Sequence, residues 1–209
     1  MSGVEILLTT LGVIAIATHG YSLLVYLVNR LTLKRLQPDA VRNGGAAPRI
    51  SILIPARDEA RAIGRTVLAA LSQNYPEFEV ILLNDRSSDK TRDIAQSAAA
   101  ESPAPERLRI IDGSEPPSGW LGKPWALKQA ADAASGEFLL FMDADVRLHP
   151  ATLAAAAQRL TETPYDALAL LPDFQRVGFW DEVLQPMLSY MTLFGVIIPW
   201  LNWDGQRRA

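Results

Sequence analysis

The chain has 209 residues, of which 49% are hydrophobic and 21% are charged, and its formal net charge is −3 at pH 7. It contains no cysteine, which excludes disulfides and thiolate metal sites, and it has no basic block of the kind that binds nucleic acid. Beyond an apolar N-terminal segment and its linker, about 160 residues remain, enough for a single hydrophobic core. We therefore expect one folded domain and no nucleic-acid partner.

Residues 6–28 form a mostly apolar run of about 23 residues, long enough for a helix to cross a bilayer. Glu5 precedes the run and Arg30, Lys34 and Arg35 follow it, whereas a signal peptide would begin with positive charge. The positive-inside rule then places the N-terminus outside and the rest of the chain in the cytoplasm. We expect a single-pass anchor in the cell (inner) membrane over residues 1–30, a basic linker with glycine and proline over 31–48, and a folded domain over 49–209.

From Arg49 onward, strand-like and helix-like segments alternate. Apolar runs typical of buried strands lie at residues 49–55, 78–83, 108–111, 138–142 and 167–171. Helical periodicity or helix-start signals lie between them, over 59–73, from 89 to 100, from 123 and from 150. The alternation predicts a Rossmann-like α/β fold, with a mostly parallel sheet covered by helices on both faces. In such sheets ligands bind beyond the carboxyl ends of the strands.

Asp143 and Asp145 follow the most apolar of these runs. In a strand, residues i and i+2 point to the same side, so the two carboxylates would lie together while Ala144 turns into the core. Neighbouring carboxylates repel unless a positive charge lies between them, and Mg²⁺ or Mn²⁺ prefers oxygen ligands and keeps positions open for substrate phosphates. The pattern predicts a metal–diphosphate site; solvated acids at a strand end are the alternative.

Four motifs occur in order: Pro-Ala-Arg-Asp-Glu at 55–59, Asn-Asp-Arg-Ser-Ser-Asp-Lys-Thr at 84–91, Gly-Lys-Pro-Trp-Ala-Leu at 122–127 and Asp-Ala-Asp at 143–145. Together they resemble the motifs of family 2 glycosyltransferases with the GT-A fold, and the resemblance covers roughly residues 49–150. The stretch from 119 to 125 and the hydrophobic ends are similar to membrane-anchored members associated with hopanoid and carotenoid lipids.

The resemblance implies a role for each matching residue. The residues it places at the nucleotide sugar are Pro55, Ala56, Arg57, Glu59, Asp85, Lys123 and Asp143, and those at the metal are Asp143 and Asp145. Asp85 would accept a hydrogen bond from the base, commonly uracil, and Lys123 would lie near the diphosphate as a point charge. Alternatively, Glu59 serves only the first turn of its helix, and Arg57 and Lys123 are solvated cations.

The implied reaction is an inverting displacement of a nucleoside diphosphate from the anomeric carbon by an acceptor hydroxyl, which requires a general base. The family places that base well downstream of Asp-x-Asp. The acids available there are Asp166, Asp173, Asp181 and Glu182, and none lies in a recognisable base motif. We interpret them as surface or capping acids, and expect a complete donor half with an incomplete acceptor half.

A second apolar stretch, residues 187–201, contains aromatic side chains and Pro199. It is short for a membrane span, so it predicts either a helix in the membrane interface over about 183–201 or packing against the sheet. An interfacial helix would favour a lipid acceptor.

Three functions remain open. The first is a membrane-anchored, metal-dependent glycosyltransferase of the hexosyltransferase type, with a UDP-sugar as the expected donor. The second is a truncated or inactive nucleotide-sugar-binding module. The third, a nucleotidyltransferase, is disfavoured because residues 55–59 contain no glycine to form a phosphate-binding loop.

Overall fold

The computed structural model describes residues 2–32, 36, 47–163, 166–170 and 178–180. The chain divides into two compact units, Met1–Arg35 with Leu171–Ala209, and Leu36–Leu170. The first unit contains helix α1 (Gly3–Thr32). The second contains, in chain order, β1 (Ile50–Ala56), α2 (Ile63–Leu71), β2 (Phe78–Asn84), α3 (Thr91–Ala100), the 3₁₀ helix η2 (Pro105–Arg107), β3 (Leu108–Asp112), α4 (Gly122–Asp132), β4 (Phe138–Phe141) and α5 (Thr152–Glu162).

Helix α1 is capped and satisfies its own polar groups. Ser2 Oγ accepts from the Glu5 N–H at 3.2 Å, and a Glu5 carboxylate oxygen accepts from the Ser2 N–H at 2.8 Å, which is a capping box. The hydroxyls of Thr9, Thr10 and Thr18 donate to the carbonyls of the preceding turn, so these groups need no water. By length and composition α1 can cross a membrane.

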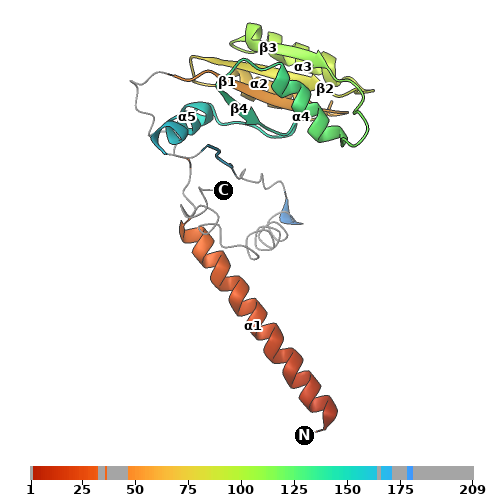
Figure 1. The fold of residues 1–209 in the computed structure, drawn as a ribbon, viewed down its shortest axis with the longest axis vertical. Helices are drawn as coiled ribbons and strands as arrows, with labels where there is room; N and C mark the ends of the chain where they lie inside the picture. The colour runs from red at the N-terminus through yellow and green to blue at the C-terminus, as the bar shows by residue number, and fades with distance from the viewer. Residues whose placement is uncertain (1, 33–35, 37–46, 164–165, 171–177, 181–209) are drawn as a thin grey trace. The chain divides into compact units, whose positions relative to one another are not determined.

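The second unit is built on a parallel sheet with strand order β3-β2-β1-β4 (Figure 1). β1 pairs with β2 along its full length, from Ile50 opposite Phe78 to Ala56 opposite Asn84, but it pairs with β4 only as far as Leu53. The chain runs outward from β1 to β3 and then returns to the other side of β1. This reversal of strand order leaves a crevice at the carboxyl ends of β1 and β4, where ligands bind in open α/β sheets.

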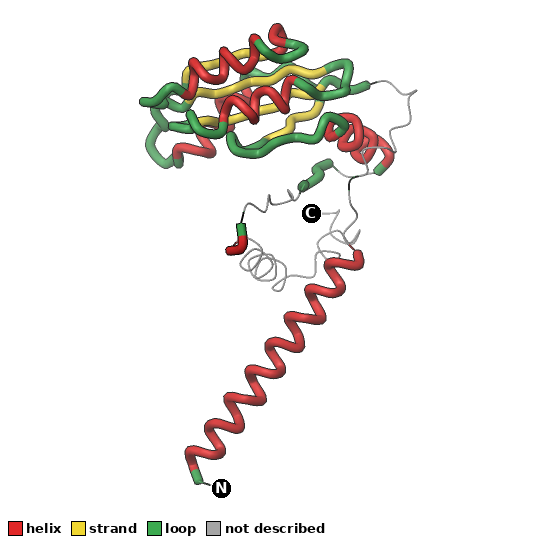
Figure 2. The backbone as a smooth tube through the Cα atoms, turned by 180° about the vertical axis from the view of Figure 1, so that it is seen from behind, coloured by secondary structure: helices red, strands yellow, loops and turns green. Residues whose placement is uncertain are grey.

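Helices cover both faces of the sheet, as Figure 2 shows. One face packs on α2, α3 and α5 through the buried strand residues Ile52, Ile54, Val80 and Leu82. The opposite face packs on Ala126 and Ala130 of α4 through Leu53, Ile81 and Leu83. Strands buried on both faces read as continuous apolar runs, which is why the sequence indicated a parallel sheet. The predicted α/β fold is confirmed.

β1 continues through Pro55, where the sequence predicted its end. The Met142 N–H donates to the Leu53 carbonyl at 3.1 Å, so the backbone hydrogen-bonding groups of Leu53 point toward β4. Backbone groups alternate in direction along a parallel strand, so those of Pro55 point toward β4 as well. β4 ends at Phe141, opposite Leu53, so the N–H that proline lacks would have had no strand partner. Proline therefore costs the sheet no ladder hydrogen bond here.

The strand predicted at 167–171 is wrong for its described residues, since 167–170 are irregular. Leu171 lies outside the described residues. An apolar run becomes a strand only beside a hydrogen-bonding neighbour, and the described part of the sheet contains β1 to β4 alone. The predicted helix at 183–201 and most of the predicted linker at 31–48 also lie outside the described residues.

Side-chain hydrogen bonds join the loops that follow β1 and β2. Asp58 Oδ1 accepts from the Ser88 N–H at 2.7 Å and from the Ser88 hydroxyl at 3.0 Å. The Asp58 N–H donates to Ser87 Oγ at 3.1 Å, and the Glu59 N–H donates to Thr91 Oγ1 at 2.8 Å. Asp58 has a φ of 55°, a left-handed conformation that aspartate tolerates better than most residues. We call these four hydrogen bonds the loop clasp, because they make the two loops one unit.

Gly136, at the entry to β4, has no room for a side chain: a Cβ there would lie 2.6 Å from Ser51 N and 2.9 Å from Ile50 C. We expect Gly136→Ala to lower the free energy of unfolding by about 1–3 kcal/mol through overpacking. The matched control is Gly122→Ala, whose Cβ would meet only Asp85 Oδ2, at 4.0 Å, and which should keep or raise stability because alanine favours helix. Thermal unfolding of the detergent-solubilised chain measures both; equal melting temperatures would contradict the close approach at Gly136.

Hydrogen bonds from Ser88 hold the pKa of Asp58 below its ordinary value. A carboxyl group with a depressed folded pKa stabilises the fold above its unfolded pKa of about 3.9, and this contribution is lost as the pH falls through the folded pKa. Asp58→Asn removes this titration, so its melting temperature should fall less steeply below about pH 4 than that of the wild type. Asp89, whose pKa is lowered by Thr91, still titrates in the variant. Parallel curves for the two proteins would contradict a clasp role for the Asp58 carboxylate.

Candidate functional site

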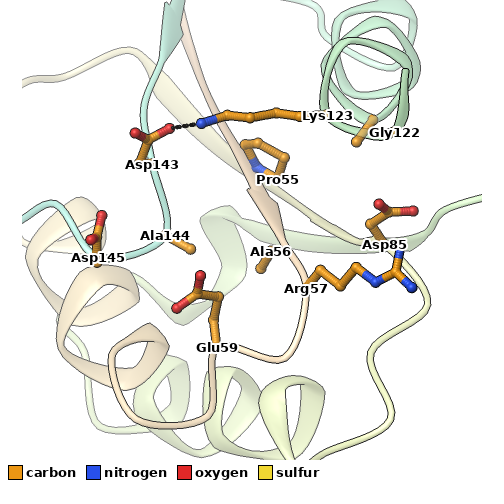
Figure 3. Close-up of a pocket in the computed structure, with 11 residues that line it drawn as sticks. Pro55, Ala56, Arg57, Glu59, Asp85, Gly122, Lys123, Asp143, Ala144 and Asp145 are labelled. Carbon is orange, nitrogen blue, oxygen red and sulfur yellow. Dashed lines mark hydrogen bonds and ion pairs between the residues drawn. The ribbon is translucent and has the colours of Figure 1, made fainter. Parts of the chain in front are cut away.

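A pocket of about 340 Å³ opens at the carboxyl end of β1, on the β4 side (Figure 3). Its volume lies in the range of small-molecule sites. The residues that line it are Pro55, Ala56, Arg57, Glu59, Asp85, Gly122, Lys123, Ala126, Asp143, Ala144 and Asp145. Every residue that the sequence predicted for the nucleotide sugar or the metal is among them. They come from the end of β1 and the loops after β1, β2 and β4, and from the start of α4, so the fold gathers segments that are far apart in the sequence.

Glu59 lies in the loop after β1, ahead of helix α2, which begins at Ile63. Its N–H belongs to the loop clasp, and its side chain lines the pocket (Figure 3). The Glu59 carbonyl accepts from the N–H groups of Ala62 and Ile63, both at 3.0 Å, so Glu59 also opens the turn that leads into α2, and its role at the nucleotide sugar stays a prediction. Arg57, in the same loop, is exposed and also reaches the pocket.

Asp85 is the buried acid of the site, with 6% of its surface exposed. Its N–H donates to the Ala56 carbonyl at 2.8 Å, which holds it beside the end of β1. Its Oδ1 accepts from Arg86 Nε at 3.1 Å, and Arg86 also pairs with Glu115 at 2.5 Å. Among the described residues no hydrogen bond reaches Oδ2, which faces the start of α4 at Gly122. Asp85 thus keeps one carboxylate oxygen available as an acceptor.

Arg86 was not predicted from the sequence. Its φ of 58° is unusual for a residue with a side chain, and hydrogen bonds to Asp85 and Glu115 raise its pKa, so it stays charged. Strained backbone of this kind is frequent at functional sites. A single arginine after the second predicted strand gave no signal of a left-handed conformation.

Asp143 and Asp145 follow β4, as the sequence predicted, but they lie in a turn and not in the extended strand geometry that was expected to put both on one side. β4 ends at Phe141, and the Val146 N–H donates to the Asp143 carbonyl at 3.2 Å. The ladder between β4 and β1 stops at Leu53, and the next residue of β1 whose backbone faces β4 is Pro55, which has no N–H to offer. Ala144 is 4% exposed and packs in the core, as expected, while both aspartates are exposed.

Lys123, near the start of α4, pairs with Asp143 across the pocket mouth. Its Nζ lies 2.6 Å from Asp143 Oδ1, as the dashed line in Figure 3 marks. Both side chains are more than half exposed, so the pair contributes little to stability. The pair does hold the Lys123 ammonium group beside Asp143, one of the two aspartates of the turn.

The carboxylates of the turn fit a cation that takes its other ligands from substrate. Mg²⁺ usually binds through one or two carboxylates together with phosphate oxygens and water. Within the described ranges, no group of three or more His, Cys, Asp or Glu side chains could hold a metal. The donor set of Asp143 and Asp145 therefore suits Mg²⁺ or Mn²⁺ shared with a diphosphate, and does not suit a closed structural site.

Of the acids downstream of Asp145 that the sequence left as base candidates, Asp166 alone is described. It is exposed and does not line the pocket. Asp173, Asp181 and Glu182 lie outside the described residues. Gly122 and Ala126 line the pocket although the sequence gave them no role; both belong to the motif at 122–127, but neither side chain carries a chemical group that would have singled it out.

Two curated relatives have informative names. The 4,4'-diaponeurosporenoate glycosyltransferase of Staphylococcus haemolyticus is 32% identical over 86% of this chain and 46% of its own length. The beta-monoglucosyldiacylglycerol synthase of Trichormus variabilis is 32% identical over 50% of this chain and 22% of its own length. The chain therefore spans less than half the length of these relatives.

Two solved structures are similar to parts of this chain. The mannosyltransferase PcManGT from Pyrobaculum calidifontis, in complex with GDP-Man and Mn²⁺, is 26% identical, with a TM-score of 0.54, over 71% of this chain and 42% of that one. S. aureus TarS in complex with UDP-GlcNAc is 29% identical, with a TM-score of 0.46, over 55% of this chain and 31% of that one. The parallel sheet and its helices match the GT-A fold of the mannosyltransferase.

The sequence profile described as "Glycosyl transferase family 2" matches residues 51–201, which include all of the sheet strands except the first residue of β1. The match, the fold and the pocket agree: the chain belongs to glycosyl transferase family 2, whose enzymes take sugars from nucleotide donors.

Proposed function

We propose that the protein is a membrane-anchored, metal-dependent glycosyltransferase that moves a sugar from a nucleoside diphosphate to a hydroxyl of a lipid acceptor, with inversion at the anomeric carbon. One observation carries the donor half of the proposal. The residues predicted for the nucleotide, the diphosphate and the metal line a single pocket at the switch point of the sheet.

The nucleobase of the donor lies at the Asp85 end of the pocket, where Asp85 Oδ2 accepts a hydrogen bond from an N–H of uracil or guanine. Arg86 donates a hydrogen bond to the other oxygen, Asp85 Oδ1, and so orients the Asp85 carboxylate toward the nucleobase. A buried, oriented carboxylate discriminates well, because a base without the matching donor leaves a charge unpaired.

The diphosphate lies between Lys123 and the turn of Asp143 and Asp145. Lys123 leaves the Asp143 carboxylate and pairs with phosphate oxygens of the nucleotide. The Asp143 carboxylate is then free to bind the divalent cation. A bound Mg²⁺ or Mn²⁺ supplies Lewis-acid stabilisation of the departing diphosphate. The side chains of this chain thus bind and orient the leaving group and neutralise its charge.

A lipid acceptor is supported by two observations. Helix α1 is long and apolar enough for a membrane anchor, and the basic residues after it favour a cytoplasmic sheet unit, on the side where nucleotide sugars are made. The names of both relatives include lipids, a carotenoid in one and a diacylglycerol in the other.

A nucleotide-sugar-binding module without catalysis is the second candidate. It is favoured by one observation, that no downstream acid among the described residues lines the pocket. Donor binding without sugar transfer to lipid extracts, and without hydrolysis of the donor, would select this candidate over the enzyme.

We expect Asp145→Asn to weaken Mn²⁺-dependent binding of UDP or GDP by an order of magnitude or more, because it removes an anionic ligand of the cation. Calorimetric titration of each nucleotide, with and without Mn²⁺, measures the effect. Asp132→Asn, which removes an exposed carboxylate on α4 paired with Lys128, is the matched control and should bind as the wild type does. Unchanged Mn²⁺ dependence in Asp145→Asn would contradict its role as a ligand, and a folded wild type that binds neither nucleotide would contradict the donor site.

We expect Asp85→Ala to weaken nucleotide binding about 10–100-fold, the range for losing a hydrogen bond to a charged group. Pyrophosphate has no base, so its Mn²⁺-dependent binding should stay within about twofold of the wild type. Competition between pyrophosphate and labelled UDP or GDP separates the two effects. If the variant weakened pyrophosphate as much as nucleotide, Asp85 would not be the contact for the base.

A further inference from the structure

Thr66 lies in the middle of α2, is 0% exposed and donates its hydroxyl hydrogen bond outside its own helix. The acceptor is the carbonyl of Ala144, at 2.7 Å, on the turn between Asp143 and Asp145. A threonine within a helix usually bonds the carbonyl four residues earlier. For Thr66 that carbonyl, of Ala62, lies at 3.4 Å, so Ala144 is the nearer acceptor.

This hydrogen bond fixes the turn at Ala144 to helix α2. The Ala144 methyl group is packed in the core, so both the side chain and the carbonyl of the central residue are held. Two groups fixed on one residue leave little freedom for the peptide planes that carry Asp143 and Asp145. The directions of the two carboxylates therefore depend on a hydroxyl that does not touch the pocket.

The same helix holds the far end of the loop that follows the turn. Gln73, just beyond α2 and 7% exposed, donates to the His149 carbonyl at 3.0 Å and accepts from the Leu153 N–H at 3.2 Å. The Asn74 N–H donates to the Pro150 carbonyl at 2.7 Å. Two buried polar side chains, Thr66 within α2 and Gln73 just beyond its end, thus fasten the segment between β4 and α5.

We infer that Thr66 is a positioning residue for the cation site: its buried hydroxyl holds the Asp143–Asp145 turn in the geometry that binds the divalent ion. The inference rests on the proposed function. A turn that is already held in place loses less conformational freedom when its two carboxylates bind the ion. Hydrogen bonds behind metal ligands commonly change metal affinity about 10–100-fold when removed.

The test compares Thr66→Val, which keeps the shape and removes the donor, with Thr66→Ser, which keeps the donor. Mn²⁺ is titrated into the detergent-solubilised full chain in the presence of UDP or GDP, and the free ion is followed by its electron paramagnetic resonance signal. We expect Thr66→Val to weaken Mn²⁺ binding about tenfold, and Thr66→Ser to stay near the wild type. Nucleotide affinity in EDTA should change less than about twofold, since the base contact lies elsewhere.

Thr161→Val is the matched control, because the Thr161 hydroxyl bonds only carbonyls of its own helix. It should bind Mn²⁺ as the wild type does. If Thr66→Val does not fold, Thr66→Ala and Thr66→Ser make the same comparison, since both lack the methyl group and only serine has the donor.

Equal Mn²⁺ affinity with and without the donor overturns the inference and leaves the proposed function standing. A loss of nucleotide affinity in EDTA as large as the loss of Mn²⁺ affinity also overturns it, because the role would then be general support of the fold. A folded wild type that binds neither nucleotide, with or without Mn²⁺, overturns the inference and the proposed function together.

Discussion

The unequal pairing of β1 governs the site. β2 accompanies β1 to its last residue, whereas β4 stops at Phe141, so the final residues of β1 have a neighbour on one side only. On the open side β1 accommodates Pro55 without losing a hydrogen bond, and polar side chains can gather beyond the last ladder pair. The pocket is thus the direct result of a short strand beside a long one.

Polar side chains outside the pocket hold its walls. Asp58 ties the loop after β1 to Ser88 in the loop after β2, and Thr66 ties the turn after β4 to α2. In each case a short side chain supplies the partner of a backbone group, and at Ala144 that group is buried and would otherwise be unpaired. The segments that reach the ligand are loops, yet hydrogen bonds to regular structure or to each other restrict them.

The sequence predicted the parallel sheet and the lining of the pocket well because both follow from local pattern. Buried strands read as apolar runs, and the side chains after them must meet at one edge of the sheet. It did not predict Arg86 or Thr66, whose importance depends on partners up to 78 positions away in the chain. It wrongly placed a strand at 167–170 and ended β4 at Met142 instead of Phe141, because strand ends are decided by neighbouring strands, which a local pattern does not contain.

The ion pair between Lys123 and Asp143 places a positive charge directly beside one of the two aspartates of the pocket. The Lys123 ammonium group acts as an internal counter-ion of Asp143. Under the proposed function, a divalent ion arriving alone must displace an ammonium group, whereas a nucleotide draws that group away with its phosphates. The nucleotide then raises the affinity for the ion, and the ion raises the affinity for the nucleotide by the same factor, as thermodynamic linkage requires. Lys123 couples the two binding events.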